Sequence, residues 1–370
     1  MEYVVYVHVP PAGIEPAPPP PEGGALSPEL WGLKDIPRLP AGKISGRRLV
    51  FFMALKLAGQ WVWDSWFVRD GEDFHVFYLQ ASRGLLDPNR RHRNVSVGHA
   101  VSKDLTNWTV LPDALTPSEP SASKRTFDSW TTWTGSVIQN NGLWHMFYTG
   151  TSREDSGAVQ SIGHATSADL ITWTKQDADE PLRASGEHYS TLDDAVWPDE
   201  AFRDPWLFKL PSGPDNWHML FTARGRGGEY GQSGVAGRAV SNDLKKWSLL
   251  PPLNAVNQGF GEIEVLQFEI VDGVPILLFC CGSQWLSPER KSQEPGGVYS
   301  LVVDPELTSV DFSKSVWFER PGLYASRLVQ DALGNWNLLG FWDVVDGKFV
   351  GELSDPIAVT ADPARGLIAL

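Results

Sequence analysis

Three stretches of the sequence place acids beside tryptophan, arginine or another acid, close to an apolar run. WVWDSWFVRD holds Asp64 among three tryptophans, FRDPWLF holds Arg203 and Asp204, and GFGEIEVLQF holds Glu262 and Glu264. Taken alone, Asp64 could be an aspartate that caps a turn beside a tryptophan cluster, because Asp is a common turn former. Three such stretches in one chain point instead to shared chemistry.

Carboxylates gathered at one place repel one another, and that cost persists only where a function needs it. Three acids suit the cleavage of a glycosidic bond. One attacks the anomeric carbon, a second protonates the leaving oxygen, and a third holds sugar hydroxyls while positive charge develops on the ring. Arg203 can fork onto a neighbouring carboxylate or hydroxyl. A calcium ion held by the acids is the rival explanation.

A repeated unit indicates how these stretches are positioned. GHAVSKDLTNWTVLP begins at Gly98, GHATSADLITWTKQ at Gly163 and GRAVSNDLKKWSLLP at Gly237. Each copy follows an apolar strand-like run, and the spacing leaves room for a four-stranded sheet with its connections. Similar runs at 276–279 and 336–341 extend the series to five units.

Five such units predict an all-β fold, a five-bladed β-propeller, because sheets that cannot cover both their faces are stabilised by stacking radially. We expect this propeller over residues 49–370. Residues 1–48 are expected to be a Pro-rich N-terminal extension, since proline disfavours helices and central strands. The three acidic stretches belong to different units, so their side chains should converge on the propeller axis from the innermost strands.

Acids and tryptophans that recur in every copy of the repeat are expected to be structural. Asp104, Asp169 and Asp243 should bond backbone amides of the turn before the outer strand. The tryptophans that follow should fill space between blades; they are Trp108, Trp173 and Trp247.

Composition excludes several classes of partner. The chain of 370 residues carries a net charge of −14, which disfavours nucleic acid and anionic membranes as partners and favours a neutral one such as a sugar. No window approaches 18 consecutive apolar residues, and the N-terminus lacks the pattern of a secretory signal. Cys280 and Cys281 are adjacent in a strand-like run, so their side chains point to opposite faces and a mutual disulfide is disfavoured. We expect no cofactor and no metal, and the pattern specifies no oligomeric state. These features favour the cytoplasm, although a secreted chain whose leader had been removed would look similar.

Four short motifs resemble those of a known group of enzymes. WVWDSW, WTGS at 133–136, FRDP at 202–205 and EIE at 262–264 look like the motifs of the fructosyl-processing glycoside hydrolases of families 68 and 32, the levansucrase-like and invertase-like enzymes. The resemblance covers roughly residues 55–345. It implies a five-bladed propeller that cleaves a β-fructofuranosyl linkage with retention, through a covalent fructosyl intermediate. The substrates would be sucrose, fructo-oligosaccharides or fructans, and the reaction either hydrolysis or transfer.

The resemblance also implies a role for each matching residue. Asp64 would be the nucleophile, Asp204 the stabiliser that bonds fructosyl hydroxyls, and Glu264 the general acid/base. Four more residues would line the sugar subsite, namely Trp63, Trp133, Arg203 and Glu262.

Two other functions are compatible with the same sequence. Related five-bladed propellers use three acids in a similar arrangement, so an arabinofuranosidase-like enzyme acting on another furanoside is one alternative. An inactive carbohydrate-binding propeller is the other, because a fold does not define a function. The basic stretch LLDPNRRHRN, residues 85–94, is expected to be a solvated loop, with a place on the rim of the central funnel as its alternative.

Overall fold

The computed structural model describes residues 55–119, 126–176, 181–212, 214, 216–229 and 231–370. The expected Pro-rich extension at residues 1–48, with its boundary, lies outside the described residues. Short connections carry one α-helix and several 3₁₀ turns: η2 (Arg83–Leu85), η3 (Pro88–Arg93), η4 (Leu192–Asp194), η5 (Ser283–Trp285), α1 (Pro288–Lys291) and η6 (Phe312–Lys314). Within the described ranges, no helix is long and apolar enough to cross a membrane.

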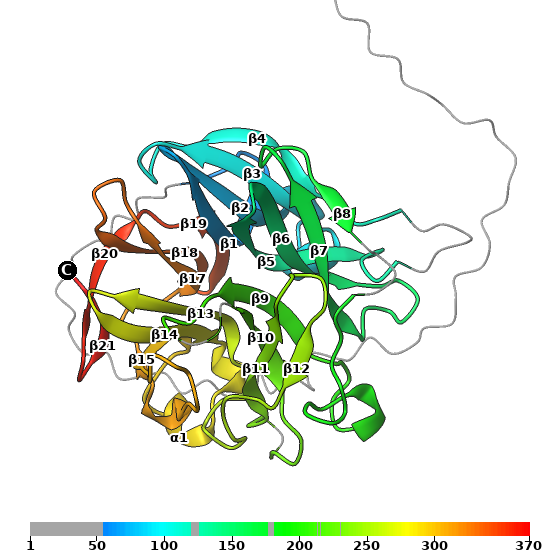
Figure 1. Ribbon diagram of the computed structural model, residues 1–370, viewed down its shortest axis with the longest axis vertical. Coiled ribbons are helices and arrows are strands. Elements are labelled where there is room, and N and C mark those ends of the chain that lie inside the picture. Colours follow the sequence, from blue (N-terminus) through cyan, green and yellow to red (C-terminus); the bar gives the residue numbers. More distant parts are fainter. Residues whose placement is uncertain (1–54, 120–125, 177–180, 213, 215, 230) are drawn as a thin grey trace, which may run out of the picture. The chain divides into compact units, whose positions relative to one another are not determined.

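Five antiparallel sheets follow one another along the chain, and we number them as blades 1 to 5 (Figure 1). Blade 1 consists of β1 (Gln60–Asp70), β2 (Asp73–Ser82), β3 (Ser96–Ser102) and β4 (Thr109–Leu115). Blade 2 consists of β5 (Thr131–Asn140), β6 (Leu143–Thr151), β7 (Gln160–Ser167) and β8 (Thr174–Gln176). Blade 3 consists of β9 (Phe202–Phe208), β10 (Trp217–Arg224), β11 (Gly234–Ser241) and β12 (Ser248–Leu250). Blade 4 consists of β13 (Glu264–Val271), β14 (Val274–Cys281), β15 (Gly297–Val302) and β16 (Val316–Trp317). Blade 5 consists of β17 (Leu323–Gln330), β18 (Trp336–Val345), β19 (Lys348–Leu353), β20 (Ile357–Asp362) and β21 (Gly366–Ala369).

The first strand of each blade is the innermost one. These strands, β1, β5, β9, β13 and β17, contact one another in that order, and β17 returns to contact β1 (Figure 1). The contacts close a ring of five sheets around an axis. The predicted five-bladed β-propeller is therefore confirmed.

The repeated tryptophans pack between blades. Trp173 of blade 2 meets Phe77 of blade 1 edge-on, with ring centroids 5.7 Å apart, and Trp247 of blade 3 meets Phe147 of blade 2 at 5.5 Å in the same way. Trp108 packs in a cluster that includes side chains of blade 5. Edge-on aromatic pairs stabilise contacts beyond the apolar area they bury, so the repeat supplies the same wedge at successive blade junctions.

The repeated acids stabilise turns, as the sequence predicts. Asp104, Asp169 and Asp243 each accept, through Oδ1, the backbone N–H groups two and three residues further on, at 2.7 to 2.9 Å. These backbone hydrogen bonds stabilise the ionised carboxylate and lower the pKa of each acid.

Each innermost strand is interrupted by a β-bulge or irregularity in its ladder with the second strand. The breaks in register lie between residues 63 and 65 of β1, 133 and 135 of β5, 203 and 206 of β9, 264 and 267 of β13, and 324 and 327 of β17. A bulge leaves its extra residue unpaired and re-aims that side chain. The five breaks surround the axis, and Asp64, Thr134 and Asp204 are among the residues they release.

The three bulges of blades 3 to 5 also require unusual backbone angles. Asp204, Val265 and Ala325 have φ values of 61°, 53° and 41°. Left-handed backbone is unfavourable for residues with a Cβ, and such strain persists where the surrounding structure over-determines it, often at functional sites. The strained bulges of the innermost strands therefore indicate a functional site around the axis.

We predict that Gly135→Ala destabilises the protein, because a Cβ at Gly135 would lie 2.2 Å from the carbonyl oxygen of Phe147 and the backbone of β6 would have to shift. Overpacking of this kind costs about 1 to 3 kcal/mol. Gly186→Ala is the control, since a Cβ there meets only Thr191 Oγ1 at 3.9 Å. Thermal unfolding measures both variants. Equal midpoints for the two would contradict the close packing of the β5 bulge.

Candidate active site

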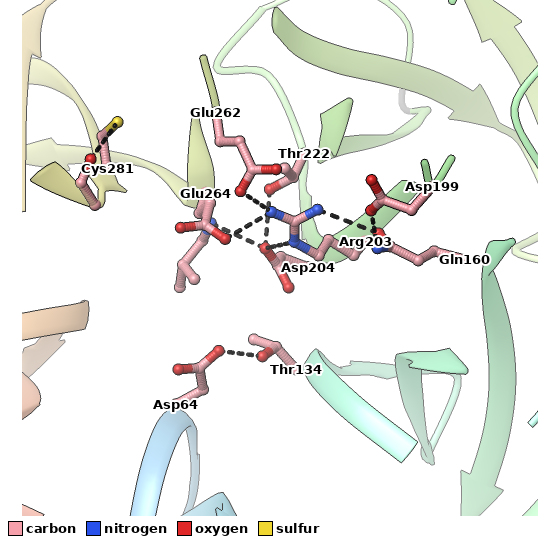
Figure 2. A network of polar contacts seen from close by, with 12 residues as sticks. Asp64, Thr134, Gln160, Asp199, Arg203, Asp204, Thr222, Glu262, Glu264 and Cys281 are labelled. Carbon is pink, nitrogen blue, oxygen red and sulfur yellow. Dashed lines mark hydrogen bonds and ion pairs between the residues drawn. The ribbon is translucent and has the colours of Figure 1, made fainter. Parts of the chain in front are cut away.

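Asp64 lies at the bulge of β1 and is held from the neighbouring blade. Thr134 Oγ1, at the bulge of β5, donates a hydrogen bond of 2.5 Å to Asp64 Oδ2. Figure 2 shows these two side chains on one side of the open centre, with Asp204 and Glu264 on the other. Two bulges thus cooperate, one presenting the carboxylate and the other fixing its orientation.

Arg203 connects the acids of blades 3 and 4. Its Nη2 atom donates to Glu262 Oε2 and to Glu264 Oε1, both at 2.6 Å, and its Nη1 donates to Gln160 Oε1 at 3.2 Å. Its Nε lies 3.6 Å from Asp204 Oδ2. One buried guanidinium therefore faces three carboxylates (Figure 2), and charge-assisted contacts of this kind are the strong class of hydrogen bond.

Asp204 is fixed by one of its two carboxylate oxygens. Oδ2 accepts from Thr222 Oγ1 at 2.9 Å and from the backbone N–H of Val265 at 3.3 Å. The backbone N–H of Asp204 donates to Thr149 Oγ1 at 2.9 Å. These bonds tie blade 3 to blades 2 and 4, and they hold the side chain through Oδ2, which leaves Oδ1 for a ligand.

Glu262 and Glu264 have different surroundings, although only one residue separates them. Glu264 Oε2 accepts from the Tyr324 hydroxyl at 2.5 Å, and its side chain is 19% exposed. Glu262 is bonded by two arginines, through Arg203 and through Arg224 Nη2 at 2.5 Å, and is 9% exposed. Glu264 is thus the acid of this pair that is open to the centre, whereas Glu262 is a buried partner of the two guanidinium groups.

Burial and neighbouring acids raise the proton affinity of Asp64. Burial and then repulsion from Asp204 raise the pKa of Asp64 to about 7; Glu264 adds to the rise, and the hydrogen bond from Thr134 opposes it. Burial also raises the pKa of Asp204, against the attraction of Arg203. Because charge repulsion falls off with distance, the repulsion that Asp64 feels from Asp204 and Glu264 places the three acids in one cluster.

Arg327 of β17 is a buried cation near this cluster, 1% exposed. Its Nη1 donates to the carbonyl oxygens of Val265 and Leu266 at 3.2 and 2.6 Å, and its guanidinium lies 4.8 Å from the Trp206 ring centroid. Burial lowers the pKa of Arg327 to about 10, and the negative charge of Asp204 opposes this lowering most strongly. Arg327 therefore supports the β13 bulge through its bonds to Val265 and Leu266. It also adds positive charge near Asp204.

The two tryptophans predicted for a sugar subsite lie beside η3. Trp133 donates from Nε1 to the carbonyl oxygen of His92 at 2.8 Å. Trp63 is 2% exposed and meets the His92 ring edge-on at 6.2 Å. Trp63 precedes Asp64 in the chain and Trp133 precedes Thr134, and the structure packs both tryptophans against the same short turn, η3.

The expectation of a solvated loop for residues 85–94 is wrong for its central residue. Arg91 is 9% exposed, and its guanidinium lies over the rings of Phe349 and Trp63, with centroids 4.0 and 5.5 Å away. Aromatic faces attract a cation, and they compensate its burial. The charge pattern of the stretch could not reveal this, because the aromatic ring that covers Arg91 most closely comes from blade 5.

Several residues of the site were not assigned a role by sequence reasoning. Thr134 lies inside the motif WTGS, so that motif was a signal for it, whereas Tyr324 lies outside the four motifs. Arg224 and Arg327 lie in ordinary strand sequences, and nothing nearby in the chain marks them. Within the described ranges, no group of three or more His, Cys, Asp and Glu side chains is arranged to hold a metal ion.

Comparisons with known proteins agree with this fold. The sequence profile of the glycosyl hydrolases family 32 N-terminal domain matches residues 65–349. The β-fructofuranosidase cell wall isozyme of Zea mays is 29% identical over 314 residues, covering 79% of this chain and 47% of that protein. A probable sucrose-6-phosphate hydrolase of Psychromonas ingrahamii is 34% identical over 188 residues, covering 50% and 29%. The chain spans less than half the length of either relative.

Solved structures share the fold. The inulosucrase of Halalkalicoccus jeotgali, determined with kestose bound, superposes with a TM-score of 0.68 at 21% identity, covering 86% of this chain and 90% of that one. The levansucrase of Gluconacetobacter diazotrophicus superposes with a TM-score of 0.60 at 18% identity, covering 87% and 82%.

Fold and site together define the class of this protein, a five-bladed propeller of the glycoside hydrolase type with its acids gathered on the axis. The family profile covers most of the propeller, from β1 to β19. The chain belongs to glycosyl hydrolase family 32.

We predict that Asp64→Asn stabilises the protein at neutral and alkaline pH. The pKa of Asp64 is about 7 in the folded protein, against 3.8 ordinarily. The folded state therefore holds a proton that the unfolded chain releases, and stability falls as pH rises from about 4 to 7. Above that window, asparagine avoids the buried charge and still accepts from Thr134, a gain of about 1 to 3 kcal/mol.

Thermal unfolding of both proteins between about pH 4 and pH 8 measures this gain. The difference in midpoint should be near zero at the acidic end and should grow across the window. A difference that stays constant with pH would show that the Asp64 carboxyl does not titrate in this range.

Proposed function

We propose that this chain cleaves a β-fructofuranosyl linkage, of the kind found in sucrose, fructo-oligosaccharides and fructans, and releases or transfers the fructosyl group. The family and the names of its relatives, among them a β-fructofuranosidase, support this choice of sugar. The observation that carries the proposal is the arrangement of Asp64 opposite Asp204 and Glu264 around one open centre (Figure 2). Retention through a covalent intermediate requires two carboxyl groups on opposite sides of the scissile bond.

Asp64 is the nucleophile in this mechanism. Thr134 holds Oδ2 of its carboxylate, which leaves Oδ1 to attack the anomeric carbon of the fructosyl unit. The attack forms an ester between the sugar and Asp64 as the bond to the leaving oxygen breaks. The attack needs Asp64 in its ionised form, which its raised pKa disfavours. The positive charge that develops on the sugar in the transition state stabilises the ionised carboxylate.

Glu264 is the general acid that protonates the leaving oxygen, and it then acts as the base for the second step. Its greater exposure and its interaction with Asp64 support Glu264 over Glu262 for this role. Burial raises the pKa of Glu262, and the two arginines that it bonds, Arg203 and Arg224, oppose the rise. We assign Glu262 to holding Arg203 in place and to contacting sugar hydroxyls.

Asp204 stabilises the sugar while the bond breaks. Its Oδ2 is occupied by Thr222 and Val265, so Oδ1 accepts hydrogen bonds from hydroxyls of the fructosyl ring. Such bonds strengthen as the ring becomes an oxocarbenium ion, which lowers the barrier more than it tightens substrate binding. Arg203, Trp63 and Trp133 complete the walls of this subsite.

In the second step a nucleophile cleaves the ester on Asp64. Glu264, now a carboxylate, takes the proton of an incoming hydroxyl, which belongs either to water or to another sugar. Water gives hydrolysis and a sugar gives transfer. The curated relatives include enzymes named for each outcome, so both products belong in the assay.

The experiment that tests this function is a product assay with sucrose, an inulin-type fructan, a levan-type fructan and an aryl arabinofuranoside. We expect fructose or fructosyl products from the first three, with Asp64→Asn lowering turnover by at least about 10³-fold because no ester can form. Methanol as acceptor should give methyl β-fructofuranoside, the retained product. Activity on the arabinofuranoside alone, or full activity of Asp64→Asn, would overturn the proposal.

We predict that Glu264→Gln and Glu262→Gln respond differently to the quality of the leaving group. Loss of a general acid typically costs 10²- to 10⁴-fold, but only where the leaving oxygen needs a proton. Glu264→Gln should therefore lose about 10³-fold on sucrose and much less on 4-nitrophenyl β-fructofuranoside. Glu262→Gln should lose similar factors on both. The reverse pattern in kcat/KM would move the acid/base role to Glu262.

We also propose that the chain works in the cytoplasm. The two cysteines, Cys280 and Cys281, are free and buried in blade 4, which supports a reducing compartment. Fractionation of cells that produce the protein, with immunodetection, tests this, and recovery outside the cell would overturn it.

A further inference from the structure

Five side chains beside the acids form a closed ring of hydrogen bonds. Arg203 donates from Nη2 to Glu262 Oε2 at 2.6 Å and from Nη1 to Gln160 Oε1 at 3.2 Å. Gln160 Nε2 in turn donates to Asp199 Oδ2 at 3.2 Å. Arg224 closes the ring, because its Nη1 donates to Asp199 Oδ1 at 2.8 Å and its Nη2 to Glu262 Oε1 at 2.5 Å.

The members of this ring come from three blades and one connection. Gln160 begins β7 of blade 2, Arg224 ends β10 of blade 3, and Glu262 lies two residues before β13 of blade 4. Asp199 lies in the connection that leads to β9, and Arg203 is the second residue of that strand. The ring therefore ties the inner end of blade 3 to both of its neighbours.

The order of donors and acceptors in the ring allows one arrangement. Arginine can only donate and a carboxylate can only accept, so Gln160 must accept from Arg203 and donate to Asp199. The backbone N–H of Phe202 also donates to Gln160 Oε1, at 3.1 Å. This second donor fixes the amide, because turning it over would place its NH₂ group against two other donors.

Glu262 depends on the ring more than Glu264 does. The side chain of Glu262 is held by Arg203 and Arg224, both of which belong to the ring. Glu264 is also bonded by Arg203, but the Tyr324 hydroxyl holds its other oxygen. A break in the ring should therefore displace Arg203 and Glu262, while Tyr324 keeps Glu264 in place.

Asp199 is the member at which the ring can be altered with least disturbance. Its side chain is 30% exposed, whereas that of Arg224 is 4% exposed and lies with its guanidinium 4.2 Å from the Trp197 ring centroid. Figure 2 shows Asp199 on the side of Arg203 that faces away from Glu264. A change of one atom at Asp199 thus alters the ring without contacting the reacting acids.

We propose that Asp199 and Gln160 are positioning residues, which act through Arg203 and Arg224 to hold Arg203 and Glu262 in the orientation that receives the fructosyl unit. This inference rests on the proposed function, since it needs a fructosyl unit bound beside Asp64. It extends the sugar subsite to two side chains that do not contact the sugar.

The test exchanges the donor and acceptor roles of the two residues. Asp199→Asn introduces an NH₂ group, so that one donor in the ring meets another. Gln160→Glu places a carboxylate against that of Asp199, so that two acceptors meet. In the double variant the new amide donates to the new carboxylate, which also accepts from Arg203. This variant restores every donor–acceptor pair and keeps the total charge of the ring.

Each single variant should lose at least about tenfold in kcat/KM, because small misplacements of binding groups are costly. The loss should be equal, within about threefold, on sucrose and on 4-nitrophenyl β-fructofuranoside, since both present the same fructosyl unit. The double variant should return to within about threefold of the wild type on both. Asp193→Asn is the matched control, because Asp193 lies in the same connection and is exposed; it should behave as the wild type.

Thermal unfolding without sugar is measured on the same proteins, and the assays are run well below the lowest midpoint. If Asp199→Asn does not fold, Gln160→Glu and the double variant decide. Wild-type kcat/KM in the single variants would overturn the inference, as would losses confined to sucrose. A double variant that regains its unfolding midpoint without regaining activity would also overturn it, since the ring would then be structural. A wild type inactive on both substrates would overturn the proposed function, whereas an active wild type with any of the other three results overturns this inference alone.

Discussion

The contact of Arg203 with three carboxylates is the interaction on which the site depends. Glu262, Glu264 and Asp204 approach one another because this guanidinium bonds or faces all of them. Burial alone would penalise the charge of Arg203, but the surrounding acids raise its pKa well above the usual value. Removing one partner from such a buried group leaves uncompensated charge and costs several kcal/mol. The acids and the arginine are therefore energetically coupled, so that a change at one of them alters the charge environment of the others.

The propeller supplies the geometry that this unit needs. Residues 64, 134, 204 and 264 come from four blades, and only a closed ring brings four first strands to one axis. The bulges then turn side chains out of the ladders, and Arg327 bonds the carbonyl groups that the β13 bulge exposes. A regular strand would alternate its side chains between the two faces of the blade. The irregular positions are therefore as much a part of the site as the acids.

The repeat architecture and the positions of the acids could be predicted from the sequence, because short stretches of neighbouring residues carry both signals. The turn acids and wedge tryptophans recur at fixed spacing, and the acids stand out by breaking that recurrence. The bulges, the bond from Thr134 to Asp64 and the burial of Arg327 were not predictable, since each depends on a strand from another blade. Arg91 shows the difference most clearly. Its neighbour Arg90 is exposed, whereas Arg91 is buried against Phe349, which lies more than 250 residues later in the chain.

The repulsion stored among the acids has a direct consequence for catalysis. In the free protein, Asp64 is pressed toward its protonated form by burial and by Asp204. In the proposed mechanism, a sugar that becomes an oxocarbenium ion places positive charge between these two carboxylates, and only then does their proximity become favourable. Interactions that are stronger in the transition state than in the ground state are the ones that accelerate a reaction. An arrangement of acids that is unfavourable in the empty site is thus suited to stabilise the charged sugar on the path to the intermediate.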